Sequence, residues 1–340
     1  MTGQIVYAEG SPCPTLVVDR RRFGSSDADV LGGLTTLRRT LHEQGDGHIL
    51  KNALIRPSKH PLFDLDYLFV QSLPAGLDQY DLRGSCGHSI LSAVLAAAKH
   101  GMIQPLLAGT RIRVNVLNNG DNVVCEVESV NDTAATFTAH FLCAPARPLA
   151  ELLMLDEPIT ELTVGDRTLR TSMVSMGNPY VFVNAADLGV TTAEELFADD
   201  SARYAQLVAI REAACARMGW DSAGAFPKIA ALLPLGPGRV AARAISVPSW
   251  HPTLALTGAI CLGAAMEIAG SLPNQLVTQV DGMVRIDTAG GSVQVLANTR
   301  GFEDPYLEWV SVGGKTVTYL SRIDLSQFTS EESSWLPVPA

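Results

Sequence analysis

Cys86 lies in a turn of small residues, 84–89 (GSCGHS), immediately before the apolar run 90–98 (ILSAVLAAA). The run predicts a helix over 87–100 that ends at Gly101, and such a helix belongs in a core because it has no polar face. A helix N-terminus lowers the pKa of a nearby thiol, and its free N–H groups favour bound anions. The turn therefore indicates a reactive thiol beside an anion site, and the alternative is an inert buried cysteine at a helix cap.

The elements that position this turn occur twice along the chain. Residues 255–270 (ALTGAICLGAAMEIAG) match residues 86–101 (CGHSILSAVLAAAKHG) in length, apolar character and closing glycine. Residues 177–179 (GNP) similarly match residues 10–12 (GSP), and each is followed by an apolar strand. The two offsets are nearly equal, at 255 − 86 = 169 and 177 − 10 = 167. Equal offsets of this kind predict an internal repeat.

Strand-like segments surround both apolar helices, so we expect an α+β fold with two domains, 1–160 and 161–330. Each domain is expected to be a mostly antiparallel sheet wrapped around one central buried helix, and the second carries an extra amphipathic helical segment at 192–218. If both helix N-termini point into the cleft between the domains, a small anion binds there. The expected strands are 5–7, 16–18, 52–55, 66–71, 111–117, 122–130, 133–141, 181–183, 285–295 and 315–320, with another helix at 28–44.

Composition limits the function classes. The chain of 340 residues is 47% hydrophobic and 18% charged, and its net charge of −10 argues against general binding to nucleic acid or anionic membranes. Residues 1–4 lack the character of a signal peptide, and no apolar run is long enough to span a bilayer. The six cysteines form no close pairs, which favours a reducing cytoplasm over a disulfide framework. No cluster has metal-ligand spacing, so no metal is expected.

Several short motifs, in this order and spacing, resemble the PrpF-type isomerases of unsaturated polycarboxylates. That family includes methylaconitate, methylitaconate and oxalomesaconate isomerases, and the resemblance covers most of the chain. It implies two tandem diaminopimelate-epimerase-like domains. The motifs are 51–55 (KNALI), 64–69 (DLDYLF), 85–87 (SCG), 177–179 (GNP) with 181–183 (VFV), 227–229 (PKI), and 251–252 (HP) with 256–259 (LTGA).

The resemblance implies that Lys51 and Cys86 carry a proton transfer that needs no cofactor. The family lysine precedes its Asp-Tyr-Leu-Phe strand by 15 residues, and here 66 − 51 = 15. To move a C=C bond, the enzyme removes an allylic proton, spreads the charge onto the carboxylate as a dienolate, and returns a proton two carbons away. Helix N-termini stabilise that charge, and either a lysine with a lowered pKa or a thiolate can be the base. Without the motif, Lys51 is more typical of a surface lysine.

Substrate contacts are expected along the same motifs. His88 follows the Cys-Gly pair, where it can cap the helix, bind substrate or relay a proton. For Asn118, Asn178 and His251 the alternative to substrate binding is a role in stabilising turns. The expected substrate-binding set is Ser11, Ser85, Gly87, His88, Asn118, Asn178, His251, Thr257 and Gly258.

Three positions depart from the family pattern. Residues 8–14 (AEGSPCP) stand where the family has an arginine and a lysine that hold carboxylates, residues 287–291 (DTAGG) replace its Gly-His-Pro-Ser-Gly turn, and His88 replaces an asparagine. Loss of two cations weakens carboxylate binding, so a less anionic substrate is expected. The repeat places Ala255 opposite Cys86, which argues against a racemase with two thiols, and Cys261 is assigned to the core.

These observations predict an isomerase that transposes a C=C bond in an unsaturated carboxylic acid related to aconitate or itaconate. Two alternatives stay open at this point. One is another proton-transfer enzyme on this fold, an epimerase or a dehydratase, and the other is a non-catalytic protein that binds small acids. The expected partner is the small acid, with a homodimer left open.

Overall fold

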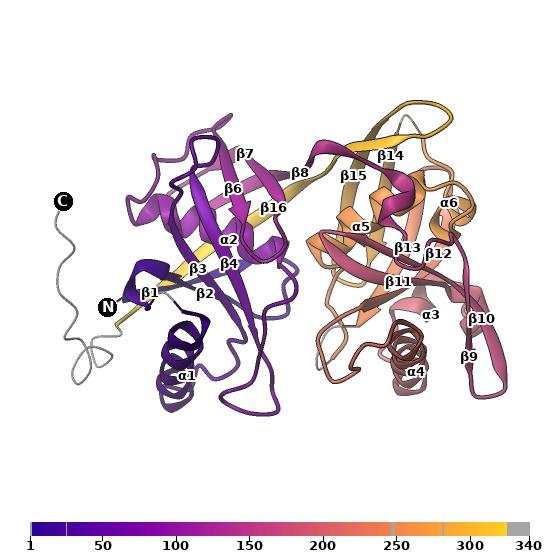
Figure 1. The fold of residues 1–340 in the computed structure, drawn as a ribbon, viewed down its shortest axis with the longest axis horizontal. Coiled ribbons are helices and arrows are strands. Elements are labelled where there is room, and N and C mark those ends of the chain that lie inside the picture. Colours follow the sequence, from indigo (N-terminus) through magenta and orange to yellow (C-terminus); the bar gives the residue numbers. More distant parts are fainter. Residues whose placement is uncertain (1, 25, 246–248, 281, 325–340) are drawn as a thin grey trace.

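The computed structural model describes residues 2–24, 26–245, 249–280 and 282–324. It is a mixed α+β fold in which one sheet forms a barrel, as Figure 1 shows. The strands are β1 (Thr2–Ala8), β2 (Thr15–Asp19), β3 (Lys51–Pro57), β4 (Leu65–Ser72), β5 (Tyr80–Asp81), β6 (Arg111–Val116), β7 (Asn122–Val130), β8 (Ala134–Pro148), β9 (Thr160–Val164), β10 (Arg167–Met176), β11 (Asn178–Asn184), β12 (Lys228–Gly236), β13 (Arg239–Ile245), β14 (Met283–Thr288), β15 (Gly291–Arg300) and β16 (Tyr306–Asp324). The helices are α1 (Asp27–Glu43), α2 (Gly87–Lys99), α3 (Ala193–Phe197), α4 (Ser201–Met218), α5 (Leu256–Glu267) and α6 (Leu272–Leu276), with 3₁₀ turns η1 (Arg20–Arg22), η2 (Leu149–Leu152) and η3 (Ala185–Leu188).

Two runs of elements follow the same topology. In the first run, β2 and β3 are parallel neighbours joined through α1, and β4 and β6 are parallel neighbours joined through α2. In the second run, α4 joins β11 to its parallel neighbour β12, and α5 joins β13 to β14 in the same way. The repeat in the sequence therefore has a counterpart in strand topology. We call β1–β8 with α1 and α2 the first lobe, and β9–β15 with α3–α6 the second lobe.

The sheet closes because β16 pairs with both ends of the first lobe. Its neighbours there are β8 and β1, so the strand order β1-β2-β3-β4-β6-β7-β8-β16 returns to β1. Its first part pairs with β15 of the second lobe, where Val312 lies opposite Val295. Figure 1 shows β16 running from one lobe to the other beside β8. The register shifts between Val312 and Lys315, across Gly313 and Gly314, as expected of a bulge that bends a long strand.

Two sequence-based expectations about strands are corrected by this topology. Residues 315–320 form a strand, but they pair with β1 and β8 of the first lobe instead of belonging to the second domain. Residues 285–295 form two strands, because the chain reverses after Thr288, which pairs with Gly291. The domain limits at 1–160 and 161–330 stay a prediction, and residues 325–330 lie outside the described residues.

α2 and α5 are the buried helices. Residues 87–97 of α2 and 256–266 of α5 are buried, in agreement with their apolar sequences. α2 packs against β1, β2, β3, β4, β8 and β16, and α5 packs against β10, β11, β15 and β16. Small side chains allow this close approach, since a Cβ atom on Gly263 would lie 2.5 Å from Val295 Cγ1.

α1 and α4 lie on the outer surface of the sheet and each presents one apolar face to it (Figure 1). Leu34 and Leu37 of α1 pack with strands of the first lobe, and Leu207 and Ile210 of α4 pack with strands of the second. The helical segment expected at 192–218 is therefore present as α3 and α4, with α1 as its counterpart. In the described part of the chain, no helix combines the length and apolar character that crossing a membrane requires.

Candidate active site

The N-termini of α2 and α5 meet between the two lobes. A Cβ atom on Gly87 would lie 2.5 Å from Leu256 Cδ2, so glycine is required for this approach. Cys86 and Ala255 are the N-cap residues of α2 and α5. Because each helix N-terminus carries free N–H groups and a partial positive charge, their convergence favours an anion between the lobes.

Lys51 and Cys86 come together at this point. Lys51 is the first residue of β3, is 7% exposed, and donates a hydrogen bond from Nζ to Ser11 Oγ at 2.7 Å. Burial raises the pKa of the Cys86 thiol, but the Lys51 ammonium and hydrogen bonds from Ser89 and Lys51 outweigh burial and lower the pKa below its ordinary value. The thiolate is thereby favoured beside the cation, as a proton-transfer pair requires.

Two buried histidines lie beside this pair. His88 is 1% exposed, its ring stacks on His251 with centroids 6.1 Å apart, and neither of its ring nitrogens has a hydrogen-bond partner among the described residues. Burial, followed by the charges of Lys315 and Lys51, holds the pKa of His88 well below its ordinary value. Burial and the Lys51 charge lower the pKa of His251 to about 3. Both rings are therefore neutral at physiological pH, and an unpaired buried ring nitrogen favours contact with a ligand.

Lys228 and Lys315 are site residues that sequence reasoning missed. Burial, followed by Arg211 and Lys51, lowers the pKa of Lys228 to about 8. Burial lowers the pKa of Lys315 to about 8 as well, and Glu9 partly opposes that shift. These two cations lie among the buried charges of the site, and the expectation of a less anionic ligand stays a prediction. One feature could have identified Lys228 as a counterpart of Lys51. Lys228 is the first residue of β12, and Lys51 is the first residue of β3.

Asn178 connects the lobes at the cysteine turn. Its Oδ1 accepts a hydrogen bond from the Ser85 backbone N–H at 3.0 Å, and its Nδ2 donates to the Ser85 carbonyl at 2.7 Å and to Thr257 Oγ1 at 3.0 Å. A second contact across the lobes runs from Thr253 Oγ1 to the Gly10 carbonyl at 2.9 Å. The Ser85 hydroxyl has no partner among the described residues. Asn178 and Thr257 thus hold the turn, while Ser85 keeps its hydroxyl available for a ligand.

Two other residues of the expected set have close neighbours within the protein. Asn118 Oδ1 accepts from the Phe69 N–H at 2.8 Å, and its Nδ2 donates to the carbonyls of Phe69 and Leu82 at 2.8 and 2.9 Å. These bonds support the turn-stabilising alternative for Asn118, because backbone groups form hydrogen bonds with both the oxygen and the nitrogen of its side-chain amide. Gly258 lies against Tyr180, whose hydroxyl would be 2.4 Å from a Cβ atom at that position.

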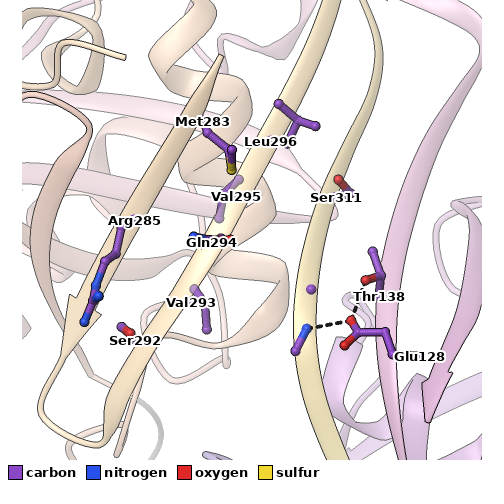
Figure 2. Close-up of a pocket in the computed structure, with 12 residues that line it drawn as sticks. Glu128, Thr138, Met283, Arg285, Ser292, Val293, Gln294, Val295, Leu296 and Ser311 are labelled. Carbon is purple, nitrogen blue, oxygen red and sulfur yellow. Dashed lines mark hydrogen bonds between the residues drawn. The ribbon is translucent and has the colours of Figure 1, made fainter. Parts of the chain in front are cut away.

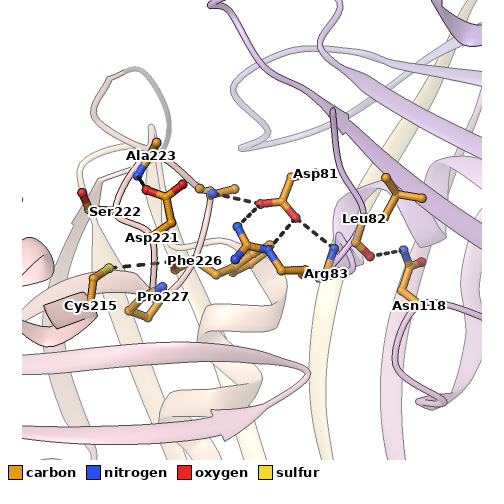
Figure 3. A network of polar contacts seen from close by, with 12 residues as sticks. Asp81, Leu82, Arg83, Asn118, Cys215, Asp221, Ser222, Ala223, Phe226 and Pro227 are labelled. Atoms are coloured by element: carbon orange, nitrogen blue, oxygen red, sulfur yellow. Dashed lines mark hydrogen bonds and ion pairs between the residues drawn. The ribbon is translucent and has the colours of Figure 1, made fainter. Parts of the chain in front are cut away.

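A network of polar contacts lies at one edge of the site (Figure 3). The Asp81 carboxylate accepts hydrogen bonds from Arg83 Nη2 at 2.9 Å and from the Ala225 N–H at 3.0 Å. The bond from Ala225 joins the first lobe to the loop 219–227. A cavity of about 300 Å³ opens here, and Phe226 packs against Gly84, two residues from the thiol. The cavity is lined by Arg83, Pro179, Gly219, Trp220, Asp221 and Phe226.

A second cavity, of about 550 Å³, contains none of the expected site residues (Figure 2). Its charged groups are already paired: Glu128 accepts hydrogen bonds from Thr138 Oγ1 and the Gly314 N–H, and Arg285 pairs with Asp287. Among the described residues, no group of three His, Cys, Asp or Glu side chains is arranged to hold a metal ion. The two residues expected to carry a proton transfer, Lys51 and Cys86, therefore lie outside this cavity.

Comparison with known proteins gives a consistent result. Residues 44–312 match the family model described as PrpF protein. The chain is 24% identical to 3-methylitaconate isomerase of Eubacterium barkeri over 82% of this chain and 81% of that protein. It is 27% identical to 2-methyl-aconitate isomerase of Shewanella oneidensis over 66% of this chain and 68% of that protein. A crystal structure of methylitaconate-delta-isomerase superposes with a TM-score of 0.66, at 20% identity, over 99% of each chain. The chain belongs to the PrpF family.

Proposed function

We propose that this protein is a cofactor-independent isomerase that transposes a C=C bond, by a 1,3-proton shift, in an unsaturated carboxylic acid related to aconitate or itaconate. The observation that carries this proposal is the Lys51 ammonium beside the Cys86 thiol, whose pKa it lowers, at the N-terminus of a buried helix. Relatives named 3-methylitaconate isomerase and 2-methyl-aconitate isomerase support the reaction class.

In the proposed mechanism, the Lys51–Cys86 pair performs the acid–base chemistry at the allylic carbon. Removal of the allylic proton leaves a dienolate whose charge extends onto the substrate carboxylate. The N-termini of α2 and α5 face that charge, and preorganised N–H groups stabilise a developing anion. Lys315 and the neutral imidazoles of His88 and His251 would bind the carboxylate through charge and N–H donation, and their burial beside the pair supports this role.

The proposal includes the arrangement of the chain around the substrate. Two tandem diaminopimelate-epimerase-like domains, 1–160 and 161–330, would each supply one central helix, and the acid would bind between them. Ala255 at the N-cap of α5 provides no thiol opposite Cys86, which argues against a racemase with two thiols. The small acid is the proposed partner.

The test is turnover of a panel of unsaturated acids that includes 3-methylitaconate, itaconate and trans-aconitate, followed by proton NMR. We expect at least one acid to be converted into its double-bond isomer and to raise the melting temperature, since a ligand of the native state stabilises it. Lys59→Met is the matched control, because Lys59 is exposed and lies outside the site. Stabilisation by an acid without any turnover would favour the non-catalytic alternative.

A further inference from the structure

Lys228 occupies in the second lobe the position that Lys51 occupies in the first. Lys51 begins β3 and lies opposite Thr15 of the parallel strand β2. Lys228 begins β12 and lies opposite Tyr180 of the parallel strand β11. An outer helix, α1 or α4, connects the two strands in each case. The repeat therefore presents a second lysine to the site from the opposite lobe.

The surroundings of Lys228 fix its position. Arg211 of α4 donates hydrogen bonds to the carbonyls of Pro227, at 2.8 Å, and Ser222, at 2.9 Å, and also to that of Gly224. These bonds hold the loop that leads into β12. The Lys228 ammonium lies over the Phe226 ring, 5.2 Å from its centroid. Lys228 is thus held by the loop 219–227, which also forms the edge of the site.

Lys228 is close enough to interact with the proton-transfer pair. The Lys51 charge disfavours the ammonium form of Lys228, whereas Cys86 and Asp81 favour it. The Phe226 ring beneath the Lys228 ammonium packs against Gly84, two residues before Cys86, so Lys228 approaches the site from the second lobe. An amine with a pKa of about 8 can both donate and regain a proton near neutral pH.

We propose that Lys228 is a second proton-transfer residue, which delivers the proton to the far carbon of the allylic system while Lys51 and Cys86 act at the near carbon. This inference rests on the proposed isomerase function. The allylic C–H bond breaks, its proton passes to the Lys51–Cys86 pair, and its electron pair enters the dienolate. A Nζ–H bond of Lys228 then breaks, and its proton forms the new C–H bond as the dienolate electrons return. Exchange with water restores a proton to Lys228 and removes one from the pair.

The alternative is that Lys228 only binds a substrate carboxylate through its charge. Arginine retains that charge but does not release a proton at neutral pH, because its pKa is above 12. Methionine removes both the charge and the proton. Comparison of Lys228→Arg with Lys228→Met therefore separates proton delivery from charge.

The experiment follows isomerisation and allylic deuterium exchange together, in heavy water, with 3-methylitaconate, itaconate and trans-aconitate as probes. We expect isomerisation to fall about 10²- to 10⁴-fold in both Lys228 variants, while exchange at the allylic carbon stays within a few-fold of the parent. Lys228→Arg should keep the parent KM, and Lys59→Met should match the parent in every measurement.

Isomerisation by Lys228→Arg at the parent rate would overturn the inference and leave Lys228 as an electrostatic anchor. Equal loss of exchange and isomerisation in both variants would also overturn it, since that pattern indicates a structural role. If the parent showed no allylic deuterium exchange with any probe, the result would instead contradict the proposed isomerase function on which the inference rests.

Discussion

Lys51 and Cys86 belong to different elements, β3 and the N-cap of α2, and the Lys51 charge acts on the Cys86 thiol. Burial alone would make the thiol a weaker acid, so its lowered pKa depends on the ammonium and on the Ser89 hydrogen bonds. His88 and His251 remain neutral beside them because burial and the nearby lysines disfavour imidazolium. The site therefore combines the Lys51–Cys86 pair with two neutral imidazoles.

Replacing Lys51 with methionine should raise the pKa of Cys86, because the thiolate loses its neighbouring cation. The measurement is the rate of Cys86 alkylation by iodoacetamide against pH, read from the labelled peptide. At neutral pH we expect slower labelling in Lys51→Met than in the parent. Lys59→Met serves as control, and an unchanged pH profile in Lys51→Met would contradict the account.

Lys315 gives a prediction about stability and pH. Its pKa is about 8 in the folded protein and 10.5 ordinarily, so between these values the unfolded chain binds more protons and stability rises with pH. At neutral pH the buried ammonium is destabilising, and Lys315→Met should raise the free energy of unfolding by roughly 1–3 kcal/mol. In urea denaturation the difference should shrink as the pH approaches about 10. A variant less stable than the parent at neutral pH would refute this.

The reactive residues could be foreseen to different degrees. Cys86 and His88 were visible because a small-residue turn before an apolar helix is a local pattern, and the motif spacing identified Lys51. Lys228 and Lys315 were not assigned to the site, since a single lysine in a strand is usually exposed and burial depends on distant strands. Asn118 and Asn178 were left open, because partner choice depends on segments far along the chain.

At the scale of the elements, close contact between helices and strands depends on a few glycines. Gly263 of α5 faces Val295 and Val310 of the sheet, where an added Cβ would lie 2.5 and 2.9 Å from their Cγ1 atoms. Gly32 of α1 has no atom within 4 Å of such a Cβ. Two glycines inside helices are thus in opposite environments.

Gly263→Ala should lower the free energy of unfolding by about 1–3 kcal/mol, because the methyl group overpacks the contact of α5 with β15 and β16. Gly32→Ala should raise it by about 0.5–1 kcal/mol, because alanine restricts the unfolded chain and favours helix. Urea denaturation of both variants checks the pair. Equal effects of the two substitutions would contradict the packing described for α5.

The helices were easier to predict than the strands. Helix 87–100 was foreseen to within one residue, since apolar content and a closing glycine are local signals. The extent of β16 was not foreseen, because its pairing with β1, at the opposite end of the chain, leaves no local signal. Residues 285–295 were read as one strand, although 287–291 (DTAGG) contains the turn that separates β14 from β15.

At the scale of the whole molecule, a few contacts across the lobes hold the site together. Asn178 binds the cysteine turn, and Asp81 binds the loop 219–227 through the Ala225 N–H. The repeat predicted a site between two similar halves, and the topology agrees with that symmetry. We did not predict that β16 pairs with strands of both halves, because that pairing depends on the closure of the barrel.

Asp81→Ala should loosen the loop 219–227, since it removes the acceptor for the Ala225 N–H. Hydrogen–deuterium exchange read by mass spectrometry should show faster exchange in that loop, with amides of α2 still protected. Asp64→Ala is the matched control, because Asp64 pairs with Arg113 inside the first lobe. Unchanged exchange of the loop in Asp81→Ala would show that the contact does not restrain it.

The most direct test of the central claim is deuterium incorporation at the allylic carbon of an unsaturated acid that the parent isomerises, measured by NMR in heavy water. The account predicts incorporation by the parent and by Lys59→Met, and a loss of about 10²-fold or more in Lys51→Met. Incorporation by Lys51→Met at the parent rate would contradict it, because removal of the allylic proton would then not depend on Lys51.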